Sequence, residues 1–214
     1  MSTFASHEGA VNADVLTSVV LTAMMLDRVI IVPRWAGGAS SDWYPSLCAA
    51  LSPTLTSIRA LDLPSPQAPT IDAWVGGIEA ALAELDDAAL ARTLVIGHSV
   101  GCRALLHALA RQAPGRRVGG LLLVAAWWTI DSPWPTIIPW IETPTDLDRV
   151  RGAAPPPRVL LSDNDPFTAD FRRNRARWEE LLGASVTVVA GARHFNGAEE
   201  PAVAEAVADL LAGR

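Results

Sequence analysis

One serine lies in a sequence context that could make it a nucleophile. Ser99 is the central residue of the run Gly-His-Ser-Val-Gly at positions 97–101, which follows an apolar run directly. Glycines two positions before and after a serine permit a sharp turn from a strand into a helix, in which the serine hydroxyl stands above the sheet. Alternatively Ser99 only caps the next helix, since serine is a good N-cap. Capping explains neither glycine, so we expect a nucleophilic serine.

A serine hydroxyl is a weak nucleophile at neutral pH, and it needs a histidine base that a carboxylate orients. His194 follows the last strand-like run of the chain, and two aspartates, Asp163 and Asp165, follow the run before it. The chain order is therefore serine, acid, histidine. Asp165 is preferred because it lies deeper in its loop and precedes a proline suited to starting a helix, and Asp163 stays as the alternative acid.

The other histidines do not suit the role of base. His7 lies near the start of the chain, and His107 is two turns along the helix expected after Ser99. His98 is adjacent to Ser99, but a tight turn directs its side chain elsewhere. We therefore expect His194 to be the base.

Short β-rich runs alternate with helical stretches from Arg28 onward, which is typical of an α/β fold with a parallel sheet. The strand-like runs are Val29–Val32, Leu55–Leu61, Thr93–Ile96, Val118–Val124, Arg158–Leu161 and Val186–Val189. The helical stretches are Trp43–Leu51, Ile71–Leu85, Ser99–Gln112, Phe167–Leu182 and Pro201–Leu211. We predict a six-stranded parallel sheet with helices on both faces. Ser99, the acid and the base would then meet at its carboxyl edge.

Composition narrows the class of protein. With 214 residues, 50% of them hydrophobic, the chain can build one sizeable core. A net charge of -6 argues against nucleic acid or an anionic membrane as the main partner, so a small molecule is expected. Cys48 and Cys102 show no metal-ligand or disulfide spacing, and we expect no metal and a reducing, cytoplasmic compartment.

Two regions stand apart from this pattern. Residues 1–27 are expected to form an extension, helical or disordered, ahead of a single domain at 28–214, and the apolar run within it is too short to span a membrane. Residues 127–157 form a long irregular segment that holds half of the eight tryptophans. Trp127, Trp128 and Trp134 either line a substrate pocket at the carboxyl edge or pack a loop that no helix covers.

Three blocks of sequence give the chain a resemblance to a known family. They are Gly97–Cys102, Ser162–Phe167, and His194-Phe195 with its following asparagine. The chain resembles the α/β-hydrolase superfamily, and within it the small serine hydrolases similar to retinoblastoma-binding protein 9. The resemblance implies Ser99 as nucleophile, Asp165 as acid and His194 as base. It also implies a minimal α/β-hydrolase fold, without the two strands that open the sheet of larger members. Together with the short connections and the right-handed crossover rule, the resemblance predicts the strand order 2-1-3-4-5-6.

The turn geometry and the resemblance together predict an oxyanion hole. One donor is the backbone N–H of Val100, directly after the nucleophile. By resemblance the other is the N–H of Trp35, in the loop after the first strand. Arg34 stands where the family usually has glycine, and it either binds a substrate carboxylate or pairs with a nearby aspartate. The run Ala36–Gly38 lacks the P-loop lysine, so no nucleotide and no other cofactor is expected.

These expectations converge on one activity. The chain is predicted to be a serine hydrolase that cleaves a small ester or related acyl compound through an acyl-serine intermediate. Two alternatives remain: an acyltransferase that uses the same three residues, and a binding protein without catalysis on the same scaffold.

Overall fold

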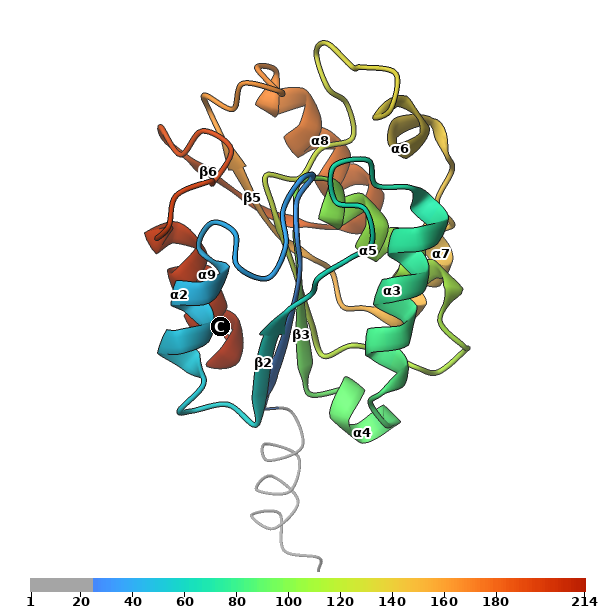
Figure 1. Cartoon of the computed structure of the whole chain (residues 1–214), viewed down its shortest axis with the longest axis vertical. Coiled ribbons are helices and arrows are strands. Elements are labelled where there is room, and N and C mark those ends of the chain that lie inside the picture. The colour runs from blue at the N-terminus through green and yellow to red at the C-terminus, as the bar shows by residue number, and fades with distance from the viewer. Residues whose placement is uncertain (1–24) are drawn as a thin grey trace, which may run out of the picture.

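The computed structural model describes residues 25–214, whose strands form one parallel six-stranded sheet (Figure 1). The strands are β1 (Arg28–Val32), β2 (Ser57–Ala60), β3 (Thr93–His98), β4 (Gly120–Val124), β5 (Arg158–Ser162) and β6 (Ser185–Val189). Their order is β2-β1-β3-β4-β5-β6, which confirms the predicted topology. Every strand therefore ends at the same edge of the sheet.

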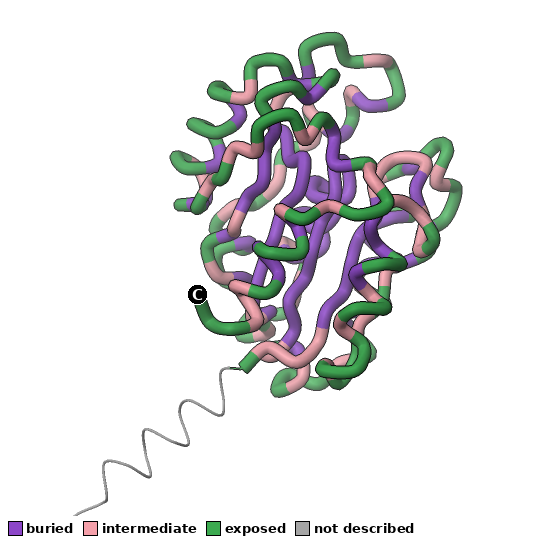
Figure 2. Tube along the Cα trace, turned by 90° about the vertical axis from the view of Figure 1, so that its left-hand side faces the viewer, coloured by how far each residue is buried: buried purple, intermediate pink, exposed green. Residues whose placement is uncertain are grey.

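Burial separates the central strands from the edges. All residues of β3 and β4 are buried, whereas β2 and β6 are exposed or half-buried throughout. Figure 2 shows the buried strands running through the middle of the molecule between exposed outer segments. A strand covered by helices on both faces must be apolar along its whole length, and this explains the continuous apolar runs of the inner strands.

Helices cover both faces of the sheet. They are α2 (Tyr44–Leu51), α3 (Ile71–Ala83), α4 (Asp87–Leu90), α5 (Val100–Arg111), α6 (Ile138–Glu142), α7 (Leu147–Ala153), α8 (Phe171–Leu182) and α9 (Pro201–Leu211). Helices α2 and α9 pack on one face and form a core with one side of β1, β3 and β4 (Figure 1). Helices α3, α5, α7 and α8 pack on the other face and form the larger core.

Two predicted elements are corrected by the structure. The segment 127–157, expected to be irregular, contains the short helices α6 and α7. Pro139 occupies the first turn of α6, where its missing N–H costs nothing, and Asp146 caps α7 by accepting from Arg149 N. Helix α8 begins at Phe171 instead of residue 167, because the Asp170 side chain accepts from Arg173 N and sets the helix start there.

Most of the predicted extension at 1–27 lies outside the described residues. Within the described part, Asp27 N–H donates to Arg92 O at 3.0 Å, beside the start of β1. None of the helices between residues 25 and 214 is both long and apolar enough to cross a membrane.

Candidate active site

Ser99 lies in a strained turn between β3 and α5. Its backbone has φ 54° and ψ -121°, a conformation that side-chain-bearing residues adopt rarely and mostly at functional sites. A Cβ at Gly97 would lie 2.8 Å from Cys102 Cα, and one at Gly101 would lie 2.4 Å from the carbonyl oxygen of Pro33. Both glycines are therefore required by close backbone contacts, one within the turn and one with the end of β1.

His194 lies in a second strained loop, which follows β6. The residues on either side of it, Arg193 and Phe195, have φ angles of 51° and 53°. The loop is held from two directions: Arg193 N–H donates to Asn164 Oδ1 at 2.7 Å, and the Trp43 indole N–H donates to the carbonyl oxygen of Phe195 at 3.1 Å. These bonds fix the position of the imidazole from both neighbouring residues.

Asp165 is the carboxylate that contacts the imidazole. Its Oδ2 lies 2.7 Å from His194 Nδ1, and its Oδ1 accepts from Phe167 N–H at 2.9 Å. Both side chains are almost completely buried. Asp163, the alternative acid, instead accepts the backbone N–H of Gly191 at 2.8 Å. An ionised carboxylate only accepts hydrogen bonds, so His194 Nδ1 carries a proton, and in the neutral imidazole Nε2 is then the atom with the free lone pair.

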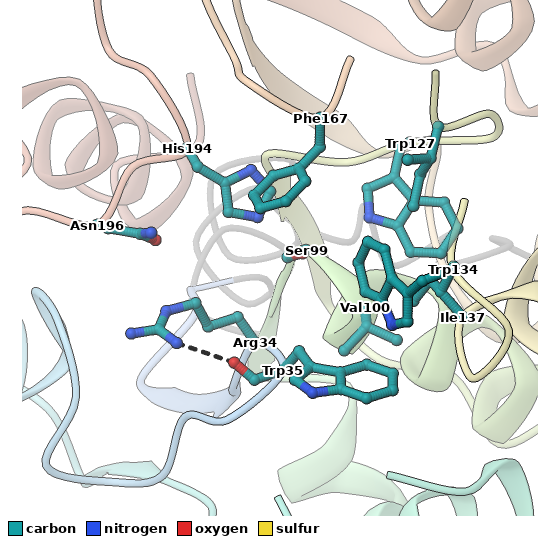
Figure 3. A pocket seen from close by; sticks show the side chains of 11 residues that line it. Arg34, Trp35, Ser99, Val100, Trp127, Trp134, Ile137, Phe167, His194 and Asn196 are labelled. Carbon is teal, nitrogen blue, oxygen red and sulfur yellow. Dashed lines mark hydrogen bonds between the residues drawn. The ribbon is translucent and has the colours of Figure 1, made fainter. Parts of the chain in front are cut away.

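Ser99 and His194 line the same cavity, which has a volume of about 370 Å³. Figure 3 shows His194 and Phe167 on one side of Ser99, with the tryptophans on the other. The Phe167 ring stands edge-on to the imidazole, with a centroid distance of 4.8 Å. Among the described residues, Ser99 Oγ makes no hydrogen bond to His194, and such contacts commonly tighten only when substrate is bound.

The two residues predicted to supply the oxyanion donors, Val100 and Trp35, both line this cavity. Val100 is the first residue of α5, so its N–H has no partner within the helix. Trp35 lies in a tight turn in which Gly37 N–H donates to Arg34 O at 2.9 Å. Because a trans peptide is planar, this bond also directs Trp35 N–H to the opposite side. Within residues 25–214, neither N–H donates to another protein group.

Arg34 is occupied by other contacts. Its Nε and Nη2 donate to the two carboxylate oxygens of Asp42 at 2.7 and 2.9 Å, and Nη1 donates to Trp35 O at 2.8 Å (Figure 3). Of the two interpretations of this arginine, the structure shows the pairing with aspartate. The guanidinium still lies at the rim of the cavity, with its charge neutralised.

The cavity is mainly apolar. Its lining residues are Arg34, Trp35, Ser99, Val100, Trp127, Ile130, Trp134, Ile137, Phe167, His194 and Asn196. Sequence reasoning missed Ile130, Ile137, Phe167 and Asn196. Phe167 and Asn196 could have been found, because each lies two residues after a predicted catalytic residue.

Trp128, predicted as a pocket residue, is not in this lining. Its ring packs on Trp178 with a centroid distance of 4.7 Å, under the guanidinium of Arg103. The backbone N–H groups of Trp128 and Thr129 both donate to Asn174 Oδ1 on α8, at 2.7 and 3.1 Å. These bonds turn Trp128 toward α8 while its neighbour Trp127 faces the cavity.

The described residues, 25–214, include no group of three or more His, Cys, Asp or Glu side chains that could hold a metal ion.

Burial raises the pKa of the Cys102 thiol, which lies under the Ser99 turn and is completely buried. This thiol is therefore neutral, and Cys102 is not among the described residues that line the cavity, whereas Ser99 is.

Comparison with known proteins identifies the family. The profile of the Serine hydrolase family matches residues 29–212. YdeN from Bacillus subtilis (strain 168) is 24% identical over 103 residues, which are 48% of this chain and 52% of YdeN, so the match spans about half of that curated relative.

Solved structures support the fold. The ydeN gene product of B. subtilis superimposes with a TM-score of 0.74 at 19% identity, covering 88% of this chain and 100% of that chain. Est1E from Butyrivibrio proteoclasticus superimposes with a TM-score of 0.63 at 14% identity, covering 89% of this chain and 88% of that chain. Since the family profile extends from β1 into α9, the chain belongs to the Serine hydrolase family, and its structure has the α/β-hydrolase fold.

Proposed function

We propose that this protein hydrolyses a small uncharged ester through an acyl-serine intermediate, with Ser99, Asp165 and His194 as the catalytic residues. The observation that carries the proposal is the 2.7 Å bond between His194 Nδ1 and Asp165 Oδ2, at a cavity that also exposes the strained Ser99. This bond leaves His194 Nε2 free to accept a proton, which is what a serine nucleophile requires.

Acylation follows from this geometry. Ser99 Oγ attacks the ester carbonyl carbon while its proton passes to His194 Nε2. The carbonyl oxygen becomes an oxyanion that accepts hydrogen bonds from the N–H groups of Val100 and Trp35. The tetrahedral intermediate then collapses: the bond to the alcohol oxygen breaks, and His194 gives its proton to the leaving alcohol.

Deacylation repeats these steps with water. His194 Nε2 takes a proton from a water molecule as the water oxygen attacks the acyl carbon. The second tetrahedral intermediate breaks its bond to Ser99 Oγ, which regains the proton from His194. The carboxylic acid leaves, and the enzyme returns to its starting state.

The cavity lining indicates the class of substrate. Apolar side chains from Trp127, Trp134, Ile130 and Ile137 surround one side of Ser99. Arg34, the one cationic group among the described lining residues, is already paired with Asp42. A charged acyl group would lose hydration here without gaining a partner. The favoured substrate therefore carries an aromatic or branched aliphatic group beside the ester carbonyl.

A fluorophosphonate probe tests the proposal. We expect the purified protein to be labelled at Ser99 and Ser99→Ala to remain unlabelled, while p-nitrophenyl esters are cleaved only by the unsubstituted protein. Absence of labelling would favour a binding protein. If the esters are cleaved but an added alcohol captures most of the acyl group, the enzyme is a transferase instead of a hydrolase.

A further inference from the structure

A buried pair of polar side chains lies beneath the Ser99 turn and takes no part in the steps above. His98 is the last residue of β3 and precedes Ser99, and Tyr44 is the first residue of α2. Both are completely buried, with 0% of each residue exposed. Buried polar groups of this kind are costly unless every one of them is paired.

Each polar atom of the pair has a partner. Arg34 N–H donates to Tyr44 Oη at 3.1 Å, and Tyr44 Oη lies 2.7 Å from His98 Nδ1. On the other side of the ring, His98 Nε2 lies 2.9 Å from the carbonyl oxygen of His194. One unbroken chain of hydrogen bonds thus runs from the loop after β1 to the loop after β6.

The two ends of this chain determine the direction of its outer bonds, and the neutral form of the imidazole determines the direction of the bond between them. A backbone N–H only donates and a carbonyl oxygen only accepts. His98 Nε2 must therefore carry a proton, and the Tyr44 hydroxyl donates to Nδ1 of the neutral ring. Burial lowers the pKa of His98 well below its ordinary value and raises that of Tyr44, so both stay neutral.

The ends of the chain lie next to catalytic groups. Arg34 N–H is one peptide unit before the Trp35 N–H, which is the proposed oxyanion donor. The His194 carbonyl belongs to the proposed base itself, and His98 is covalently joined to Ser99. We propose that Tyr44 and His98 are positioning residues, which hold the Trp35 turn and the His194 loop in fixed positions relative to Ser99. This inference rests on the proposed function.

The Tyr44→Phe variant tests the inference, because it removes one hydroxyl and keeps the ring that packs in the core. We expect kcat to fall roughly 10- to 100-fold with KM unchanged, since small displacements of catalytic groups have effects of this size. The matched control is Thr93→Val. Thr93 lies at the opposite end of β3 from His98, and its hydroxyl donates to Ala89 O at 2.8 Å. This control also loses one buried hydroxyl, and its kcat should not change.

A second variant separates positioning from a general loss of packing. His98→Gln keeps an amide donor that can face His194 O. If Tyr44 and His98 act through one chain, the double variant with Tyr44→Phe should be little slower than the slower single variant. Independent, multiplicative losses would contradict the proposal, as would Tyr44→Phe with kcat within twofold of the unsubstituted protein.

The tautomer of His98 provides a measurement that does not depend on activity. Nitrogen-15 NMR of the imidazole should show the Nε2–H form of the neutral ring at pH 7, and in Tyr44→Phe the Nδ1 resonance should shift. A protonated ring or the Nδ1–H form would overturn the inference. If the tautomer is as expected but the unsubstituted protein resists the fluorophosphonate, the proposed function fails, and with it the catalytic role of the network.

Discussion

The two sides of the cavity are built in different ways. On the polar side, Ser99, His194 and Arg34 come from loops at the ends of three different strands, β3, β6 and β1. On the apolar side, Trp127, Ile130, Trp134 and Ile137 belong to one segment, residues 127–137, which follows β4. Trp35, from the loop after β1, packs edge-on against Trp134 on this side (Figure 3). The polar side therefore depends on the sheet, and most of the apolar side depends on a single loop.

This difference predicts that the polar residues determine the reaction and that the apolar residues determine which esters are cleaved. Strand register places the polar residues: β1 and β3 pair up to Val32 and Gly97, immediately before the turns that carry Arg34 and Ser99. The apolar segment is held by a few contacts, among them Asp131 N–H to Phe167 O at 3.1 Å and Ala169 N–H to Asp131 Oδ2 at 2.6 Å. Substitutions in the apolar segment should change which esters fit and leave the reaction itself intact.

The largest effect is expected when the polar side loses its nucleophile or its base. Ser99→Ala and His194→Ala should each lower kcat on the order of 10⁶-fold, and the double variant should be little slower, because these residues act as a unit. Steady-state hydrolysis of p-nitrophenyl esters measures this loss, and circular dichroism checks that each variant is folded. Near-normal turnover in either variant would refute the mechanism.

A smaller loss is expected for the orienting acid. Asp165→Asn should lower kcat on the order of 10⁴-fold, since an amide cannot hold the His194 tautomer that frees Nε2. Asp163→Asn is the matched control in the same loop, because among residues 25–214 the Asp163 side chain accepts only from Gly191 N–H. This control should keep near-normal turnover. The opposite ranking of the two variants would transfer the acid role to Asp163.

The apolar side should respond through selectivity. Trp134→Ala removes an aromatic wall of the cavity and should lower kcat/KM for a benzoyl ester roughly 10- to 100-fold, while an acetyl ester is cleaved as before. Trp128→Phe is the control, because Trp128 packs on Trp178 outside the cavity lining. A parallel loss on both esters would mean that the two sides of the cavity are not independent.

The smallest expected effect concerns stability in acid. Burial lowers the pKa of His107 on α5 to about 4, with Arg103 and Arg111 adding to the shift. The folded protein keeps this histidine neutral, while the unfolded chain binds a proton below about pH 6.5. The free energy of unfolding should therefore decrease as the pH falls from 6.5 toward 4.

His107→Gln removes this titration. The free energy of unfolding should then decrease between pH 7 and pH 5 by roughly 1 kcal/mol less than in the unsubstituted protein, after allowance for solvent screening. Urea denaturation at both pH values measures the change, and the ratio of benzoyl to acetyl ester cleavage at neutral pH should stay the same. An unchanged pH dependence of stability in the variant would show that His107 is not the titrating group.

The sequence alone determined the sheet order and the candidates for catalysis. The glycines around Ser99 predict a turn from local sterics, and parallel strands bring the ends of distant runs to one edge. The strand order also draws on the right-handed connection rule and on the resemblance to α/β-hydrolases, which supports the three catalytic candidates as well. For this reason Ser99, Asp165 and His194 could be proposed, and the topology predicted, before any contact was known.

Only the tertiary structure decided which way individual side chains point. Asp163 and Asp165 are two residues apart, and the contact with His194 depends on how the loops after β5 and β6 pack. Trp128 faces α8 because Asn174, 46 residues later, accepts its backbone N–H. No local pattern encodes contacts between segments so far apart, because they form only when the helices and strands pack together.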